Sequence, residues 1–475
     1  MNIITIMSDE HSWQAMANAG SAYALTPNLD RLASLSQDFT NAYTSCPVCA
    51  PARASWFTGQ YVCNLGTWDN STPYDGGVYG IGSWMKEHDI AVHHIGKTHF
   101  HPDGDYGFAS ALAPGYLESP DLGCYYRDDN VRRLGAERRF QRIGIKKGPS
   151  HDDELVAMAL RWLDDPPSGP WVLDIGLLDP HFPFYVTQEH WDQFSAIIPE
   201  HLPDGVLPPF TSLNGPLQSL RTYFAAELAD EETTRRAFIG YFAAVKELDE
   251  HIGQILDKLE EKGLIDDTVV IYTSDHGEQL GYHGMWWKCC MFEQSAHIPL
   301  MIRHPRIPAR KIEAPVSIAD IFPTMCGIMG IDCPEDCDGQ TLLALMKDGQ
   351  DASRRDYAFS EYNAHGLSGG MYMIRWNHYK YVFYTEAEPQ LFDLVADPSE
   401  DHDLYEASMT DPQLGKVVEE CHWRLLECCD PFEVNRRSKD FQARMKKRLG
   451  LPESYTLERS VGYVPHPEYV KRRRG

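Results

Sequence analysis

Four short apolar runs along this chain each end in a group of polar side chains. The runs are Ile3–Met7, Ile90–Ile95, Trp171–Leu177 and Thr268–Thr273, and Asp, His or Lys follows each of them closely. Short β-branched runs that alternate with helical patterns predict a mainly parallel sheet with helices on both faces. Because ligands bind outside the carboxyl ends of strands in such sheets, the four polar exits predict one site built from distant segments. The alternative is that they are solvated loop residues.

The rest of the chain predicts a second, smaller domain. In the α/β domain, expected at residues 1–350, Leu300–Arg303 is a further strand and Arg235–Lys262 is the clearest helix, since its apolar side chains recur at helical spacing and Gly263 follows. After residue 351, "MYMIRWNHYKYVFY" alternates like antiparallel strands, and a helix is expected near Leu414–Cys428. We therefore expect an α+β domain with an antiparallel sheet at residues 351–430. Residues 431–475 are expected to be an arm across a neighbouring subunit of a homo-oligomer, or a frayed tail.

The overall charge argues against two classes of partner. A formal net charge of −26 over 475 residues disfavours nucleic acids and anionic membrane surfaces. No apolar run reaches the length of a transmembrane helix, and "MNIITIMSDEH" lacks the features of a signal peptide, so we expect a cytoplasmic location. The 12 scattered cysteines do not resemble a secreted disulfide framework, and most are expected to be buried thiols.

The stretch "SCPVCAPARASWFTGQY", residues 45–61, has four interpretations. A redox dithiol at Cys46 and Cys49 would normally open a helix in a small βαβ unit, which the sequence does not show. A zinc site needs a second ligand pair, and nothing supports a pairing with Cys333 and Cys337. A cysteine-phosphatase loop needs a longer spacing than the three residues between Cys49 and Arg53. A modified cysteine nucleophile is the interpretation that remains.

Cys49-Ala50-Pro51-Ala52-Arg53 resembles the Cys-x-Pro-x-Arg signature of the type I sulfatases, in which the cysteine is oxidised to the aldehyde formylglycine. Other segments resemble that family in the same order: "TPNLDRLASLSQDFTNAYTS", "GKTHF", "DPHFPF", "YTSDHGEQLGYHGMWWK" and "PQLFDLVADPSED". The resemblance covers about residues 2–410 and implies an alkaline-phosphatase-like α/β fold. It implies hydrolysis of a sulfate ester of a small organic alcohol or phenol, with release of inorganic sulfate. It also implies a formylglycine-generating or other sulfatase-maturating enzyme as a partner.

Within this family the chain is most similar to the choline-sulfatase and phosphonate-monoester-hydrolase branch. "CAPARASWFTGQ", the pair Asp69-Asn70, "SEYNAHG" and "MIRWNHYKY" resemble that branch, and Asp275-His276 replaces the Asp-Asn of many arylsulfatases. Choline sulfatases usually carry Ala-Glu-Gly where this chain has Ala364-His365-Gly366, which argues against choline as the substrate. Many sulfatases begin with Asp-Asp where this chain has Asp9-Glu10, and the second of these positions is often not a metal ligand in the branch.

The resemblance also implies roles for single residues. A hydrated aldehyde can attack sulfur with one hydroxyl and expel sulfate when the other loses its proton. A divalent cation (Mn, Ca or Mg) would be held by Asp9, Cys49, Asp275 and His276. Arg53, one helical turn after the nucleophile, would hydrogen-bond the diol. Around the sulfate, the expected residues are His99 as base, His181 or Lys288 as acid, Lys97 and Asn70 on the sulfate oxygens, and Glu361 facing a cationic substrate group.

Two other functions stay open at this point. Phosphonate monoesters and phosphodiesters are also tetrahedral monoanions, and the same aldehyde and metal would hydrolyse them. A non-catalytic anion-binding protein on this fold, with Cys49 left as a thiol, would be expected to lose ligands or anion-binding residues, and this chain keeps them. Each of these residues also has a purely structural interpretation. Asp275 could cap a helix, Glu361 could form an ion pair, and Lys97 and Lys288 could be solvated.

Overall fold

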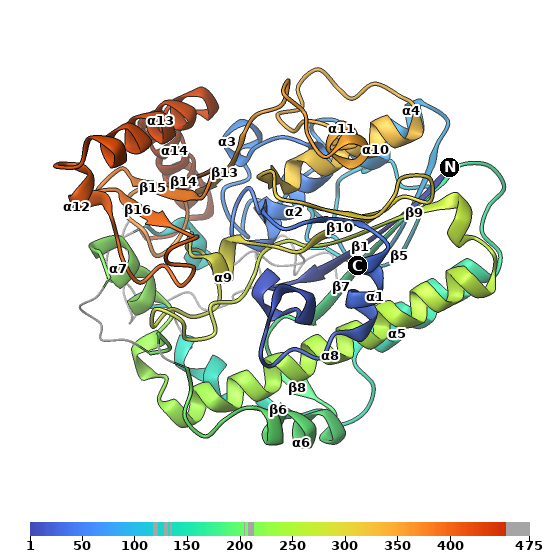
Figure 1. The fold of residues 1–475 in the computed structure, drawn as a ribbon, viewed down its shortest axis with the longest axis horizontal. Coiled ribbons are helices and arrows are strands. Elements are labelled where there is room, and N and C mark those ends of the chain that lie inside the picture. Colours follow the sequence, from blue (N-terminus) through green and yellow to red (C-terminus); the bar gives the residue numbers. More distant parts are fainter. Residues whose placement is uncertain (117–121, 128–131, 134, 204, 208–212, 453–475) are drawn as a thin grey trace.

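An eight-stranded, mostly parallel sheet forms the centre of the protein (Figure 1). The structure is a computed structural model that describes residues 1–116, 122–127, 132–133, 135–203, 205–207 and 213–452. The strand order is β11-β2-β10-β9-β1-β7-β4-β5, and β10 alone runs antiparallel to its neighbours β9 and β2. The strands are β1 (Asn2–Asp9), β2 (Gln37–Phe39), β4 (Ala91–Lys97), β5 (Ser110–Gly115), β7 (Trp171–Pro180), β9 (Thr268–Ser274), β10 (Leu300–Arg303) and β11 (Arg310–Ile312).

The four apolar runs of the sequence become the four adjacent parallel strands β9, β1, β7 and β4. Along β1, Ile4 and Ile6 face one apolar core while Ile3 and Met7 face another, so both faces of the sheet are buried. Strands covered on both faces are expected to read as continuous apolar runs. The parallel register brings the carboxyl ends of all four strands to one edge, as the polar exits predicted.

Helices cover both faces of the sheet. One face packs against α1 (Pro27–Ser34), α5 (His151–Asp164) and α8 (Glu231–Glu261), and the other against α2 (Cys49–Thr58), α4 (Ile81–Glu87), α10 (Ile321–Met329) and α11 (Leu343–Asp348). The predicted long helix is α8; the Asp230 side chain caps its first turn, and Gly263 adopts a φ of +66° just beyond its end. Because the predicted strands and helices are present, the doubly covered α/β architecture is confirmed.

Shorter elements complete the α/β region. They are the strand pairs β3 (Ala42–Tyr43) with β12 (Val316–Ser317) and β6 (Ile143–Ile145) with β8 (Phe184–Val186), and the helices α3 (Val62–Leu65), α6 (Gln188–Ile197), α7 (Gly215–Tyr223) and α9 (Glu293–Ala296). Short 3-10 helices occur at η1 (Trp13–Ala15), η2 (Ala17–Ala19), η3 (Leu122–Tyr125), η4 (Ala136–Gln141), η6 (Ala226–Leu228), η7 (Ile265–Asp267) and η8 (Ile318–Asp320).

The C-terminal region contains the predicted antiparallel sheet, in the order β13-β14-β15-β16. Its strands are β13 (Tyr357–Tyr362), β14 (Met371–Trp376), β15 (Tyr379–Tyr384) and β16 (Gln390–Asp393), with helices α12 (Tyr405–Ser408), α13 (Pro412–Cys428) and α14 (Pro431–Leu449). β14 and β15 form the hairpin that "MYMIRWNHYKYVFY" predicted, with Asn377 at the turn in the left-handed region (φ 50°). In Figure 1 this region, in orange and red, lies beside the large sheet.

Helix α14 corrects the prediction for the end of the chain. An arm or tail was expected from residue 431, but residues 431–449 are helical and packed. The side chain of Gln442 donates to the Asn363 carbonyl at 3.3 Å, and Ser438 accepts from Arg127 at 2.6 Å. The buried face of α14 is mostly polar, so the helix lacks the apolar periodicity by which an amphipathic helix is recognised. Residues 453–475 lie outside the described part of the chain.

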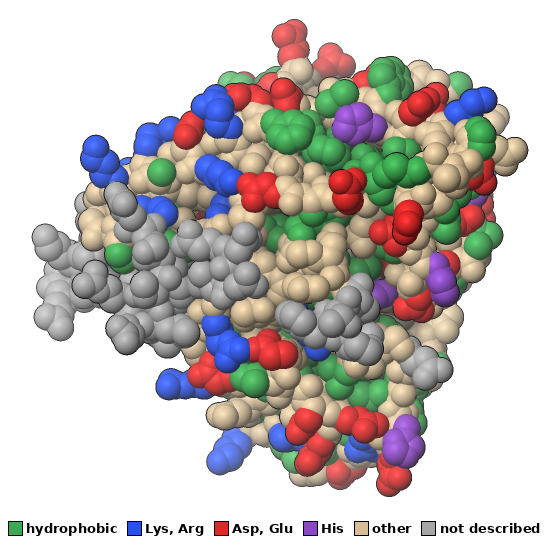
Figure 2. Space-filling view, turned by 90° about the vertical axis from the view of Figure 1, so that its left-hand side faces the viewer, with side chains coloured by type: hydrophobic (Ala, Val, Ile, Leu, Met, Phe, Trp, Pro, Cys, Tyr) green, Lys and Arg blue, Asp and Glu red, His purple; other side chains and the backbone are tan. Residues whose placement is uncertain are grey.

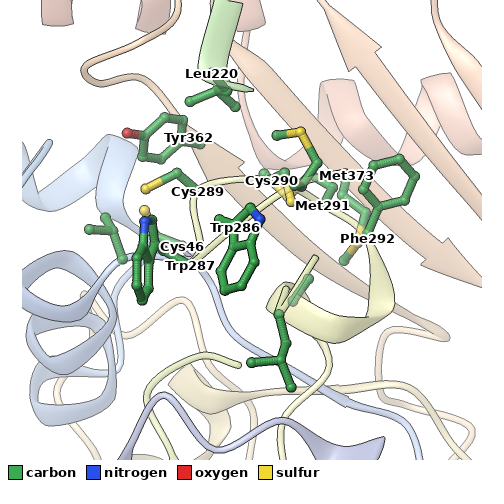
Figure 3. Close-up of a cluster of buried hydrophobic side chains, with 14 of the residues drawn as sticks. Cys46, Leu220, Trp286, Trp287, Cys289, Cys290, Met291, Phe292, Tyr362 and Met373 are labelled. Carbon is green, nitrogen blue, oxygen red and sulfur yellow. The ribbon is translucent and has the colours of Figure 1, made fainter. Parts of the chain in front are cut away.

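An apolar cluster joins the two regions. Figure 3 shows Trp286 and Cys289 of the α/β region together with Tyr362 of β13 and Met373 of β14. Cys46, the first of the two cysteines in residues 45–61, is buried in the same cluster, and all 12 cysteines are free thiols. Cys46 therefore has a packing role in this structure.

The surface carries both signs of charge. On the face formed largely by the C-terminal region, Figure 2 shows acidic and basic side chains interspersed. Among the described residues, no helix combines the length and the apolar character that crossing a membrane requires.

Candidate active site

Cys49 is the first residue of α2, and its thiol lies at the carboxyl edge of the large sheet. The Sγ atom is 3.1 Å from His276 Nε2, 3.2 Å from Lys288 Nζ and 3.7 Å from Asp9 Oδ1. The helix can begin here because the prolines of the motif fall before it and in its first turn, where no intrahelical N–H bond is needed. Cys49 is only 1% exposed, so its thiol is buried among these charged side chains.

The four residues predicted to hold a metal converge on one point. One ligand atom each from Asp9, Cys49, Asp275 and His276 lies within 4.8 Å of the other three. Asp9 ends β1, whereas Asp275 and His276 directly follow β9, so neighbouring strands deliver them. All four side chains are buried, and two carboxylates with an imidazole form a donor set that suits a divalent cation.

Arg53 lies one turn after Cys49 but bonds differently from the prediction. Its Nε donates to Asp275 Oδ2 at 2.8 Å, and Nη1 donates to the Lys97 carbonyl at 3.0 Å. The guanidinium therefore orients a carboxylate of the cluster and ties α2 to the end of β4. The sequence could not reveal this contact, because it depends on how α2 docks against the sheet.

Two lysines and a histidine surround the thiol. Lys97 Nζ is paired with Asp9, and Lys288 Nζ lies 2.8 Å from His181 Nε2. Glu10 joins this group, with carboxylate oxygens 3.2 Å from His181 Nε2 and 3.3 Å from Lys288 Nζ. Sequence reasoning considered Glu10 as a metal ligand, but it is not in the four-residue cluster. The position of Glu10 directly after Asp9 was the sequence feature that pointed to the site. The contacts of Glu10 with His181 and Lys288 could not be predicted from the sequence.

The remaining predicted residues occupy different positions. His99 is half-buried, has a left-handed backbone (φ 60°) and has a buried Nδ1 without a hydrogen-bond partner among the described residues. Asn70 accepts a hydrogen bond from the Ala50 amide at 3.0 Å and so holds the first turn of α2. Glu361 is fully buried: its Oε1 accepts from the Cys63 amide at 2.6 Å. The prediction that Glu361 faces the substrate does not fit this burial. The carboxylate, on β13, instead accepts a backbone N–H from the first turn of α3.

The electrostatics favour ionised groups. Burial would raise the pKa of the Cys49 thiol, but the charges of Lys288, Lys97 and His276 hold that pKa well below its usual value. Burial and the charge of Cys49 oppose ionisation of Asp9, yet Lys97 and other cations lower the pKa of Asp9 below its usual value. The pocket around residue 49 is therefore arranged to stabilise negative charge.

Comparison with known proteins decides the family. The family model described as Sulfatase matches residues 1–331. The chain belongs to the sulfatase family. A second model, described as N-sulphoglucosamine sulphohydrolase, C-terminal, matches residues 281–429 of this sulfatase. The protein is therefore a sulfuric ester hydrolase.

Individual relatives extend the likeness over most of this sulfatase. The choline-sulfatase of Rhizobium meliloti (strain 1021) is 31% identical over 84% of this chain and 81% of its own length. Human arylsulfatase K is 27% identical over 84% of this chain and 78% of its own. Among solved structures, the phosphonate monoester hydrolase of Agrobacterium radiobacter has a TM-score of 0.73 at 24% identity, covering 90% of this chain and 95% of that one. A structure in complex with its substrate D-glucosamine-2-N,6-O-disulfate has a TM-score of 0.74 at 22% identity, covering 92% and 98%.

Proposed function

We propose that this sulfatase cleaves the sulfate ester of a small organic alcohol or phenol, using formylglycine made from Cys49 and one divalent cation. The observation that carries the proposal is the convergence of Asp9, Cys49, Asp275 and His276 within 4.8 Å, with Lys288 3.2 Å from the thiol. This arrangement combines a nucleophile, a cation site and positive charge for the sulfate oxygens, the three elements that hydrolysis at sulfur needs.

The donor set fits the cofactors that the family implies. A divalent cation held by Asp9, Asp275, His276 and residue 49 would supply positive charge against the sulfate oxygens and lower the pKa of the nucleophilic hydroxyl. The hydrated aldehyde would supply one hydroxyl for attack on sulfur and a second whose deprotonation frees sulfate. Since Cys49 is 1% exposed, the maturating enzyme would have to reach it before folding is complete.

The surrounding side chains have separate tasks. Burial and the charge of Lys97 lower the pKa of His99 below its usual value, so this imidazole is neutral near pH 7 and can accept the proton whose loss frees sulfate. Lys288 and His181, anchored by Glu10, supply the proton that the leaving oxygen needs. Lys97 faces Asp9 and adds positive charge to the pocket.

A bound divalent cation would give this pocket the positive charge that an anionic ester needs. Three carboxylates (Asp9, Glu10, Asp275) and three permanently cationic side chains (Arg53, Lys97, Lys288) meet in this pocket. Their charges balance, so a bound divalent cation would leave the pocket net positive. A sulfate monoester, which carries one negative charge, would partly neutralise that excess.

Relative rates on matched esters test the proposal against its neighbour, hydrolysis of phosphonate monoesters or phosphodiesters. We expect kcat/KM for an aryl sulfate to exceed that for the aryl phosphonate with the same phenol. The opposite order would assign the chain to phosphonate or diester hydrolysis with the same residues. An intact Cys49 thiol, with metal bound and neither ester hydrolysed, would support the anion-binding alternative.

A further inference from the structure

A second group of two carboxylates and an imidazole lies outside the catalytic cluster, where β7 packs against α5 and α8. Ligand atoms of Asp152, Asp179 and His251 lie within 4.8 Å of one another. The three come from the first turn of α5, the end of β7 and the middle of α8. Asp152 is 1% exposed and His251 4%, whereas Asp179 is half-buried.

Two atoms in this group have unused bonding capacity. His251 Nδ1 and Asp179 Oδ2 are both buried and have no hydrogen-bond partner among the described residues. A buried polar atom without a partner is costly, so the position calls for a ligand. Asp152 Oδ2 accepts from the Leu178 amide at 2.9 Å and the Asp179 amide at 2.8 Å, whereas Oδ1 accepts only from the Leu178 amide at 3.0 Å and so keeps a lone pair for a ligand.

The histidine is oriented as metal-binding histidines usually are. His251 Nε2 bonds Asp153 Oδ1 at 3.0 Å, which leaves Nδ1 as the nitrogen available to the cluster. A carboxylate on the far nitrogen of a ligating imidazole fixes its tautomer and ring direction in metal sites generally. Asp153 is itself 3.8 Å from Lys146 Nζ, so its own charge is partly compensated.

The local charge also favours a cation. Lys146 is the one lysine paired here, and its ammonium lies 2.7 Å from Glu247 rather than against Asp179. Among the ion pairs of the described residues, none includes Asp152 or Asp179, so no side-chain cation occupies the position between the two carboxyl groups.

We propose that Asp152, Asp179 and His251 form a second divalent-cation site, distinct from the catalytic one. Two carboxylates and one imidazole suit Mn²⁺ or Zn²⁺ better than Ca²⁺, which prefers oxygen ligands throughout. The site is independent of the proposed catalytic chemistry. It would fix the end of β7, where Pro180 pairs in register with Asp9 and His181 follows.

Counting bound Mn²⁺ in the full-length chain tests this site. After chelation and saturation with Mn²⁺, we expect two ions per wild-type chain, one in H251Q and one in D275N, which disables the catalytic cluster. H190Q is the matched control, because His190 belongs to the same network through Glu247 and Glu250 but lies outside the cluster. It should keep two ions.

A stability readout separates a real site from a damaged fold. In D275N, Mn²⁺ should raise the unfolding midpoint by about 3 °C, and this rise should vanish in D275N/H251Q. D179N, which keeps the shape of the side chain, serves as a second variant if H251Q does not fold. The proposal is overturned if wild type binds one ion that D275N removes, or if H251Q and D179N both fold and still bind two. In the first case a shared proton on Asp152 and Asp179 would be the occupant.

Discussion

Two buried lysines, Lys288 in the catalytic pocket and Lys380 at the junction of the two regions, show how this protein uses internal charge in opposite ways. Lys380 is fully buried, and its ammonium bonds Glu293 at 2.6 Å, Glu400 at 2.7 Å and the Met291 carbonyl at 2.8 Å. Two carboxylates and a backbone carbonyl therefore surround the ammonium. Such a closed arrangement can hold β15 against α9 but leaves nothing for a ligand.

Lys288 is also buried, yet its surroundings are open to a further anion. It lies near the Cys49 thiol, His181 and Glu10, and the pocket that contains it would be net positive with a divalent cation bound. The comparison teaches that burial of a lysine does not identify a functional site; the balance of its partners does. Variants at the two positions should therefore affect different properties.

Removing the nucleophile should have the largest effect. C49A is expected to lose about 10⁴-fold or more in kcat, because no other side chain in the pocket can replace a covalent nucleophile. Steady-state rates on an aryl sulfate measure the loss, and circular dichroism should remain that of wild type. Residual activity within tenfold of wild type would mean that residue 49 is not the nucleophile.

Removing Lys288, the proposed acid for the leaving oxygen, should lower activity strongly without unfolding the protein. For K288Q we expect a fall in kcat of about 10²–10³-fold, the usual cost of losing one group that stabilises developing charge. The measurement is kcat on an aryl sulfate with a good leaving group and on one with a poor leaving group. A role in protonating the leaving oxygen predicts the larger loss on the poor one; equal losses would contradict that role.

Removing the junction lysine should have the opposite profile. K380Q leaves Glu293 buried without its main partner, so we expect the free energy of unfolding to fall by about 3–5 kcal/mol. The remaining folded protein should keep a kcat close to wild type. K439Q is the matched control in the same region, because Lys439 and Glu386 form an exposed pair at 2.8 Å whose loss should cost less than about 1 kcal/mol. A large loss of kcat in folded K380Q would break the comparison.

The smallest effect on activity is expected at Glu361. Burial raises the pKa of Glu361 to about 7 from a usual 4.5, so the folded state binds a proton more tightly than the unfolded state. Stability should therefore fall as pH rises from about 4.5 to 7, by on the order of 3 kcal/mol from this group. E361Q should lack this decline and keep kcat/KM within about twofold, as chemical denaturation across that pH range and assays would show. A tenfold rise in the KM of E361Q would instead support the prediction that Glu361 faces the substrate.

The central fold followed from local sequence patterns, and the end of the chain did not. Strands β1, β4, β7 and β9 are buried on both faces, so their apolar runs and polar exits were visible in the sequence. Helix α14 buries Asn435, Ser438 and Gln442, the last two with hydrogen bonds to Arg127 and Asn363. A buried face that is mostly polar leaves no apolar period to detect.

The site divides in a similar way. The convergence of Asp9, Cys49, Asp275 and His276 was predictable, because each occupies a position fixed by strand order and by the family motif. The partners of Arg53 and Glu361 were not predictable, since they depend on the docking of α2 and on the junction of two regions far apart in the sequence. The Asp152 group was also missed, because no motif marks three residues contributed by two helices and a strand.

The mass of the tryptic peptide Leu32–Arg53, taken from a preparation that hydrolyses an aryl sulfate, tests the central claim most directly. The account predicts the mass change of thiol-to-aldehyde conversion at Cys49, with Cys46 in the same peptide left as a thiol. An unmodified Cys49 in fully active enzyme would contradict the account, because the attack on sulfur would then have to come from another group.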